Sequence, residues 1–298
     1  MPNLPTAAAT RKGILMMLLA VLCFATMDAL AKGLMQKYPA PQVVWARFAG
    51  QALLVSLYIG PRRLLPTLNS PYPLIHLARS ACQLGSTAFF FISLRYIGLA
   101  EATALAEVSP MLITLGAALF LGERISRYRV IAVCAALIGA LIIIRPGSGV
   151  FSAAALLPIA AAAAYAGNGL LTRLVGQKEG PSTAMLHAAV FGTLVTGLAL
   201  PFFWHPVAAN DLPMFIILGL LGTAAQLCVI NAFSLAEASV VAPFGYIGTV
   251  IATFWGLVIF GEFPDLFTII GALVIVGAGL YVWMRESARK RSPIEDPE

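Results

Sequence analysis

The sequence predicts an all-α integral membrane fold of ten transmembrane helices, arranged as two inverted five-helix repeats. Three observations carry this prediction: the composition, the spacing of the apolar runs and the placement of the basic residues. Of the 298 residues, 60% are hydrophobic and 11% are charged, whereas a soluble domain carries about 25% charged residues. A bilayer core needs about 20 apolar residues per helix, so ten helices leave about 100 residues for loops and tails. No sizeable soluble domain is expected.

Charged residues, prolines and glycines divide the chain into ten apolar runs. The predicted spans are residues 13–34, 42–59, 76–95, 99–121, 128–144, 153–173, 183–203, 213–234, 238–260 and 267–284. The first run follows Arg11 and Lys12 as a signal peptide would, but it contains Asp28 and Lys32. It is also longer than the 7–15 apolar residues or so of a signal-peptide core, so we expect a retained span.

The basic residues divide unequally between the two faces that ten spans create. Placing the N-terminus in the cytoplasm leaves only Lys37, Arg95 and Arg145 outside, while Lys32 and Arg47 lie within spans. The fourteen cytoplasmic residues are Arg11, Lys12, Arg62, Arg63, Arg79, Arg124, Arg127, Arg129, Arg173, Lys178, Arg285, Arg289, Lys290 and Arg291. This asymmetry predicts a multi-pass protein of the cytoplasmic (inner) membrane with both termini inside. The same scatter over short loops argues against a nucleic-acid partner.

The two halves of the chain repeat weakly. Leu-Ala-Glu-Ala-Thr at 99–103 recurs as Leu-Ala-Glu-Ala-Ser at 235–239, and the Gly-Glu ending at 122–123 recurs at 261–262. Each pair lies on the fourth span of its half, and five spans per half invert the second copy. The predicted organisation is a cytoplasmic tail (1–12), a first repeat (13–146), a second repeat (152–284) and a second cytoplasmic tail (285–298).

These motifs, with Pro110 inside the fourth span, resemble the drug/metabolite transporter superfamily, specifically its ten-helix EamA family. The resemblance implies a secondary carrier that works by alternating access through a central cavity, without ATP. Met-Asp-Ala-x-x-Lys at 27–32 and Ala-Pro-Phe-x-Tyr at 242–246 look most like a subgroup with riboflavin and S-adenosylmethionine uptake carriers. The chain departs from the commoner EamA pattern at Thr249, where the counterpart of Pro110 is missing.

Four ionisable residues stand out inside the predicted spans: Asp28, Lys32, Arg47 and Glu107. Charges inside a bilayer are costly, so those that are retained face the interior and are paired or functional. Asp28 and Lys32 are spaced i,i+4 on one helix face, which favours an ion pair between them. One interpretation is a structural network that holds spans 1, 2 and 4 together; the other is a gate or a substrate site.

A set of polar and aromatic residues lies near the expected midplane. It comprises Gln83, Ser86, Thr87, Tyr165, Asn168, His187, Gln226, Asn231, Tyr246 and Trp255. Such groups also act as interhelical hydrogen-bonding partners without any ligand. Asn168 and Gln226 are the preferred candidates for substrate contact because amides orient neutral or zwitterionic ligands. His187, the one histidine expected to be embedded in the membrane, is a candidate proton relay or simply a hydrogen-bonded residue.

The predicted function is secondary transport of a small organic metabolite, with riboflavin, S-adenosylmethionine or an amino-acid-like zwitterion as candidate substrates. Export of a metabolite or drug is the alternative within the same class, and a proton is a candidate coupling ion. A membrane enzyme is disfavoured because HExxH, GxSxG and GxxxxGK[ST] motifs are absent. No catalytic residue, cofactor or metal site is expected. A non-transporting scaffold would not require an inverted repeat. The sequence leaves the oligomeric state open and is compatible with a monomer.

Overall fold

The computed structural model describes residues 7–122, 126–146, 152–175 and 180–291, and within these ranges its regular structure is entirely helical. The first half contains α1 (Ala7–Met35), α2 (Ala40–Ile59), α3 (Pro61–Leu68), α4 (Pro73–Ser93), α5 (Leu99–Ala106), α6 (Ser109–Leu121) and α7 (Arg127–Ile144). The second half contains η1 (Ala153–Ala155), α8 (Leu156–Val175), α9 (Pro181–Phe203), α10 (Leu212–Leu235), α11 (Ala238–Val241), η3 (Ala242–Tyr246), α12 (Ile247–Phe260) and α13 (Leu266–Arg291).

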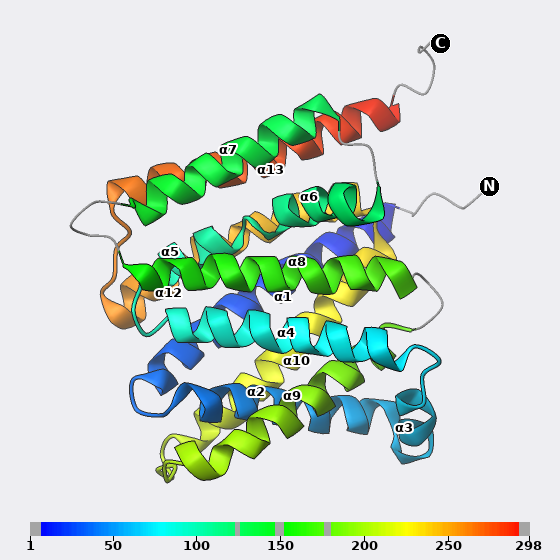
Figure 1. Ribbon diagram of the computed structural model, residues 1–298, viewed down its shortest axis with the longest axis vertical. Helices are drawn as coiled ribbons and strands as arrows, with labels where there is room; N and C mark the ends of the chain where they lie inside the picture. The colour runs from blue at the N-terminus through cyan, green and yellow to red at the C-terminus, as the bar shows by residue number, and fades with distance from the viewer. Residues whose placement is uncertain (1–6, 123–125, 147–151, 176–179, 292–298) are drawn as a thin grey trace.

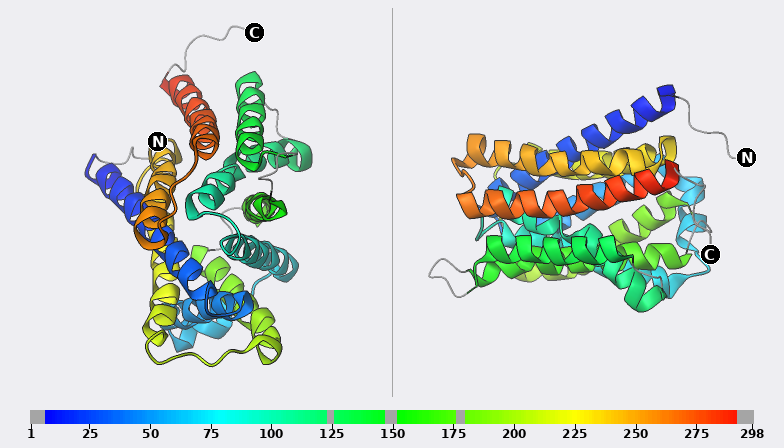
Figure 2. Two further views of the ribbon diagram at one scale, coloured as in Figure 1. Left: turned by 90° about the vertical axis from the view of Figure 1, so that its left-hand side faces the viewer. Right: turned by 90° about the horizontal axis from the view of Figure 1, so that it is seen from above.

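The helices lie roughly side by side, and the chain runs back and forth between two ends (Figure 1). We call the end where α1 begins and α13 finishes the terminal end, on the right of Figure 1, and the other the opposite end. α1 has 29 residues and is therefore about 43 Å long. It runs obliquely across the bundle in Figure 1, and Figure 2 shows that its first turns lie at the outer edge.

The fourth span of each half is discontinuous. α5 and α6 are separated near Glu107 and Val108, and Pro110 lies in the first turn of α6. The second copy is divided into α11, the 3-10 helix η3 and α12, with Pro243 in the first turn of η3. A proline is tolerated in a first turn but breaks a helix interior, because its nitrogen cannot donate a hydrogen bond. With α5–α6 and α11–η3–α12 each taken as one span, the described helices form the predicted ten spans.

The packing pairs follow the repeat. α1 packs on α10 and α4 on α8; α1 packs on α12 and α6 on α8; α2 packs on α10 and α4 on α9. These contacts form three couples, and the two contacts of a couple are related by the repeat. If each span is replaced by its counterpart five spans along the chain, α1 on α10 becomes α8 on α4, and the other two couples behave in the same way. α2 with α9, and α7 with α13, are packed onto their own counterparts. This arrangement is that of an inverted repeat, and it places the junction between the halves in the centre of the bundle.

Glycines allow the closest helix crossings, as expected for membrane helices. A Cβ on Gly50 of α2 would lie 2.7 Å from the Cα of Gly219 on α10. A Cβ on Gly139 of α7 would lie 2.8 Å from the carbonyl oxygen of Gly271 on α13. Gly192 of α9 lies under the ring of Phe48, with its Cβ position 2.5 Å from the ring. These glycines serve helix packing.

Nine helical segments within the described residues are long and apolar enough to cross a membrane. α4 is also long enough, at 21 residues, but it carries His76, Arg79 and Gln83 and is not among the nine. Large apolar side chains such as Leu198 and Phe202 cover the outside of the bundle and are 77% and 83% exposed. Such a surface fits lipid rather than water. The protein is therefore a multi-pass membrane protein. The short helix α3, which the sequence did not predict, lies at the terminal end (Figure 1).

Candidate functional site

A cavity of about 620 Å³ lies between the two halves of the bundle, and we call it the central cavity. It is lined by Arg47, Gln51, Arg79, Gln83, Ile113, Tyr165, Asn168, Gly169, Thr172, Gly180, Pro181, Ala184, Met185, Ala188, Gln226 and Ile230. The lining reaches from the interior of α2 to Gly180 and Pro181, where α9 begins at the terminal end. The cavity therefore approaches the terminal end of the bundle.

Both halves contribute polar groups to this cavity. Asn168 of α8 donates a hydrogen bond from Nδ2 to Oε1 of Gln83 on α4, over 2.9 Å. Gln226 of α10 also lines the cavity. The sequence predicted these three amides as candidate site residues, and the fold brings them to one cavity.

Three further polar lining residues were not among the candidates: Gln51, Arg79 and Thr172. Each lies four residues from a candidate, since Arg47 precedes Gln51, Arg79 precedes Gln83 and Asn168 precedes Thr172. Residues at i and i+4 lie on one face of a helix, so this spacing was the signal that would have found them.

Arg47 is a deeply buried polar residue of the central cavity. It is 5% exposed, and Nε and Nη1 have no hydrogen-bond partner among the described residues. The guanidinium carbon lies 5.0 Å from the centre of the Phe48 ring. Asp28 of α1 interacts with it electrostatically, but no hydrogen bond joins the two side chains. The predicted association of Asp28 with Arg47 is therefore present as a charge interaction.

Lys32 has a different partner from the one that its helical spacing predicted. Nζ lies 2.6 Å from Oε2 of Glu262 and donates to the carbonyl oxygen of Ile97 over 2.9 Å. The same Glu262 oxygen accepts from the backbone N–H of Leu99, over 3.3 Å. The predicted i,i+4 pair with Asp28 is wrong, because Lys32 lies one turn closer to the end of α1 and meets the connection between α12 and α13.

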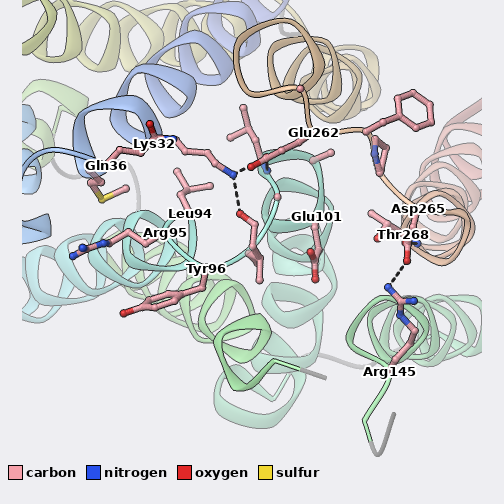
Figure 3. Close-up of a pocket in the computed structure, with 18 residues that line it drawn as sticks. Lys32, Gln36, Leu94, Arg95, Tyr96, Glu101, Arg145, Glu262, Asp265 and Thr268 are labelled. Carbon is pink, nitrogen blue, oxygen red and sulfur yellow. Dashed lines mark hydrogen bonds and ion pairs between the residues drawn. The ribbon is translucent and has the colours of Figure 1, made fainter. Parts of the chain in front are cut away.

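This ion pair lines a second cavity, of about 760 Å³, at the opposite end of the bundle. Figure 3 shows Lys32 pointing to Glu262, between the ends of α1, α5 and α12, and Arg145 pointing to Asp265 on the far side of the cavity. Glu262 had no assigned role in the sequence, and its counterpart Glu123 lies outside the described residues. The pair joins the first half of the chain to the second.

Further polar contacts join the halves at the opposite end. Nζ of Lys37 lies 3.0 Å from Oδ1 of Asp211, and the hydroxyl of Tyr38 donates to Oδ2 over 2.9 Å. These two hydrogen bonds hold the pKa of the Asp211 carboxyl below its usual range. Gln42 makes two hydrogen bonds to the backbone of His205, of 2.9 Å and 3.0 Å. The described ion pairs between the halves thus all lie at the opposite end.

Five predicted site residues line neither cavity: Asp28, Glu107, His187, Tyr246 and Trp255. Glu107 lies at the break between α5 and α6 and interacts electrostatically with Tyr165 and Tyr246. Tyr246 directs its hydroxyl at Gly279 of α13. Trp255 donates from Nε1 to the hydroxyl of Thr26 on α1, over 3.1 Å. Among the ten spans, α4 and α10, which are spans 3 and 8, contribute to the lining of the central cavity, whereas α1 and α12 do not.

His187 is not the one embedded histidine, because His76 of α4 is 2% exposed and stacks on it with ring centres 4.3 Å apart. The His187 nitrogens face two carbonyl oxygens, those of Thr183 at 2.9 Å and Leu68 at 3.2 Å. The ring therefore links α9 to α3 outside the central cavity. The described residues contain no cluster of three His, Cys, Asp or Glu side chains suited to a metal ion.

Comparison with protein families gives a match over both halves of the chain. The model of the EamA-like transporter family matches residues 11–145 and again residues 152–284. The two matches correspond to the two five-span units that the packing pairs relate.

Individual relatives cover nearly the whole chain. A riboflavin transporter of Rhizobium johnstonii is 31% identical over 284 residues, which is 94% of each chain. The pseudopaline exporter CntI of Pseudomonas aeruginosa is 30% identical and covers 90% of this chain and 94% of its own. An S-adenosylmethionine uptake transporter of Rickettsia bellii is 24% identical, over 91% and 92%. A solved crystal structure with a TM-score of 0.63, 21% identical over 94% of this chain and 98% of its own, shares the fold.

Proposed function

This chain belongs to the EamA-like transporter family, and from that premise we propose that it is a secondary carrier of a small organic metabolite, working by alternating access. The family is one of small-molecule transporters, and the similar proteins include named importers and a named exporter. The observation that carries the proposal is the central cavity, which both repeats line with polar side chains at the junction between them. Midplane sites between repeats are where such carriers bind their substrates.

The volume of the cavity supports a metabolite-sized ligand. At about 620 Å³ it falls within the range of roughly 300–1,000 Å³ that is usual for small-molecule sites. The amides of Gln83, Asn168 and Gln226 supply both donors and acceptors to the ligand. Riboflavin, S-adenosylmethionine and amino-acid-like zwitterions are accordingly the substrate classes to test first.

The contacts at the opposite end support a gate. The pairs of Lys32 with Glu262 and of Lys37 with Asp211 join the two halves there, while the central cavity approaches the terminal end. Both termini are proposed to lie in the cytoplasm, because the basic residues concentrate at the terminal end. The described arrangement then corresponds to a state that faces the cytoplasm, and opening to the outside requires these ion pairs to separate.

Transport into proteoliposomes tests the proposal. Purified protein is reconstituted and preloaded with unlabelled riboflavin or S-adenosylmethionine, and uptake of the labelled compound is followed. We expect saturable counterflow that a dissipated membrane potential does not abolish, because exchange through a carrier needs no net driving force. Uptake that rises linearly with concentration and does not respond to preloading would contradict a carrier.

Thiol labelling tests the position of the site. In a background lacking the four native cysteines, Gln226→Cys should react with a polar thiol reagent and be protected by the transported compound. Leu220→Cys lies on the same helix, α10, but carries an exposed apolar side chain and is the matched control; it should show no protection. Equal labelling of Gln226→Cys with and without saturating substrate would place the pathway elsewhere.

A further inference from the structure

The central cavity contains positive charge without acidic lining. Arg47 and Arg79 both line it, and none of the described residues that line it is Asp or Glu. Amide and hydroxyl side chains complete its polar surface, namely those of Gln51, Gln83, Tyr165, Asn168, Thr172 and Gln226. A ligand that fits this set needs acceptor atoms, and a negative charge is favoured over a positive one.

Arg47 points to one place for that negative charge. Its guanidinium is held by the face of Phe48 and by the charge of Asp28, and these contacts leave Nε and Nη1 without an acceptor. A buried charged donor that lacks a hydrogen-bond partner is costly to the fold. Gly222 of α10 packs closely beside it: a Cβ there would lie 3.0 Å from Sδ of Met27 and 3.7 Å from Nε of Arg47, so only a glycine lets α10 approach the guanidinium this closely.

We propose that Arg47 binds an anionic group of the transported molecule, a carboxylate or a phosphate, inside the central cavity. The inference rests on the proposed carrier function. A guanidinium presents its N–H donors in one plane as forks, Nε with Nη2 or Nη1 with Nη2, and each fork matches two oxygens of a carboxylate or phosphate. The anion then completes the hydrogen bonds that the empty cavity leaves unmade, while the amides of Gln83, Asn168 and Gln226 contact the rest of the molecule. Arg79 adds positive charge nearer the terminal end.

Two pairs of probes separate the anion from the rest of the ligand. S-adenosylmethionine and decarboxylated S-adenosylmethionine differ by a carboxylate, and riboflavin 5′-phosphate and riboflavin differ by a phosphate. Binding of all four to the purified wild-type protein is measured by titration. In at least one pair, we expect the member that carries the anionic group to bind about tenfold or more tightly than its partner, as a charge-assisted hydrogen-bonded pair provides. The pair that shows the preference identifies carboxylate or phosphate.

Variants then assign the preference to Arg47. Arg47→Lys keeps the charge beside Asp28 but loses the planar fork, and we expect most of the preference to disappear. Arg47→Gln should remove the preference, while the member of the pair that lacks the anionic group still binds. Arg95→Gln is the matched control, because Arg95 is exposed at the opposite end and lines the other cavity; its preference should equal that of the wild type.

The outcomes separate this inference from the carrier function. Saturable counterflow with equal affinities for both members of each pair would overturn the inference and leave the carrier standing. An anion preference that Arg47→Lys retains in full would also overturn it, since the fork would not be the binding group. An anion preference in titration without counterflow of either compound would support the inference and contradict the carrier.

Discussion

At the scale of single residues, the two partners of the ion pair between Lys32 and Glu262 differ in solvent exposure. The Lys32 side chain is 6% exposed and the Glu262 side chain is 38% exposed. Removing the carboxylate leaves a buried ammonium without its counter-charge, whereas removing the ammonium leaves a carboxylate that solvent reaches. The two single substitutions should therefore have different effects although they break the same contact.

We expect Glu262→Gln to lower the stability of the purified protein by about 1–3 kcal/mol, which is less than a fully buried pair would lose. Lys32→Met should lower it less, and the double variant should be more stable than Glu262→Gln alone. Melting temperatures in detergent, combined as a double-mutant cycle, measure this. Glu101→Gln is the control, because Glu101 lines the same cavity without an ion pair to Lys32. Additive effects of the two single substitutions would contradict the coupling.

The hydrogen bonds of Asp211 predict a dependence of stability on pH. Lys37 and Tyr38 lower the pKa of this carboxyl in the folded protein, relative to about 3.9 in the unfolded chain. The folded state binds a proton less readily, so the stabilisation is complete above pH 4 or so and is lost as the pH falls through the lower, folded pKa. Thermal unfolding between pH 7 and pH 3 should show this loss in the wild type. Asp211→Asn should be less stable at pH 7 and should show a smaller fall below pH 4.

At the scale of helices, the contact between η3 and α13 tests how tightly the broken ninth span is held. A Cβ on Gly279 would lie 1.7 Å from the hydroxyl oxygen of Tyr246, whereas a Cβ on Gly277 would meet nothing within 4 Å. Both glycines lie on α13, so they form a matched pair. The first position requires a close approach of η3, and the second does not.

Gly279→Ala should therefore lower the melting temperature and the transport rate, because η3 must move to accommodate the methyl group. Gly277→Ala should be neutral or stabilising by up to about 1 kcal/mol, the difference in helix propensity between the two residues. Adding Tyr246→Ala to Gly279→Ala should recover part of the loss. Equal effects of the two glycine substitutions would show that Tyr246 does not pack on Gly279 in the membrane.

At the scale of the whole molecule, the number of spans and the placement of charge together predict one orientation in the membrane. Ten spans put both ends of the chain on the same face, and the basic residues concentrate there. A reporter fused after Arg285 should be active only as a cytoplasmic reporter. A reporter in the loop from Trp204 to Asp211 should be active only outside. A C-terminal reporter that is active outside would contradict the orientation, and with it the assignment of the cytoplasm to the terminal end.

The sequence by itself determined the membrane class, the ten spans and the inverted repeat, because each follows from local physics. A bilayer requires about 20 apolar residues per span, and that requirement is visible in the order of residues alone. Pro110, noted inside the fourth span, lies where that span is interrupted. The three cavity amides Gln83, Asn168 and Gln226 were also found, since polar groups inside apolar spans are rare enough to stand out.

The tertiary structure alone decided which partners these groups have. Helical spacing predicted a pair between Asp28 and Lys32, but the energies of i,i+4 pairs are a few tenths of a kcal/mol. A partner from another helix replaces them easily, and Glu262, 230 residues along the chain from Lys32, takes that place. Contacts between helices also decide the surroundings of Tyr246, whose hydroxyl faces Gly279. For Arg47, the packing of α2 against α1 and α10 leaves two guanidinium nitrogens without an acceptor. Contacts between helices depend on crossing geometry, which the periodicity of one helix does not contain.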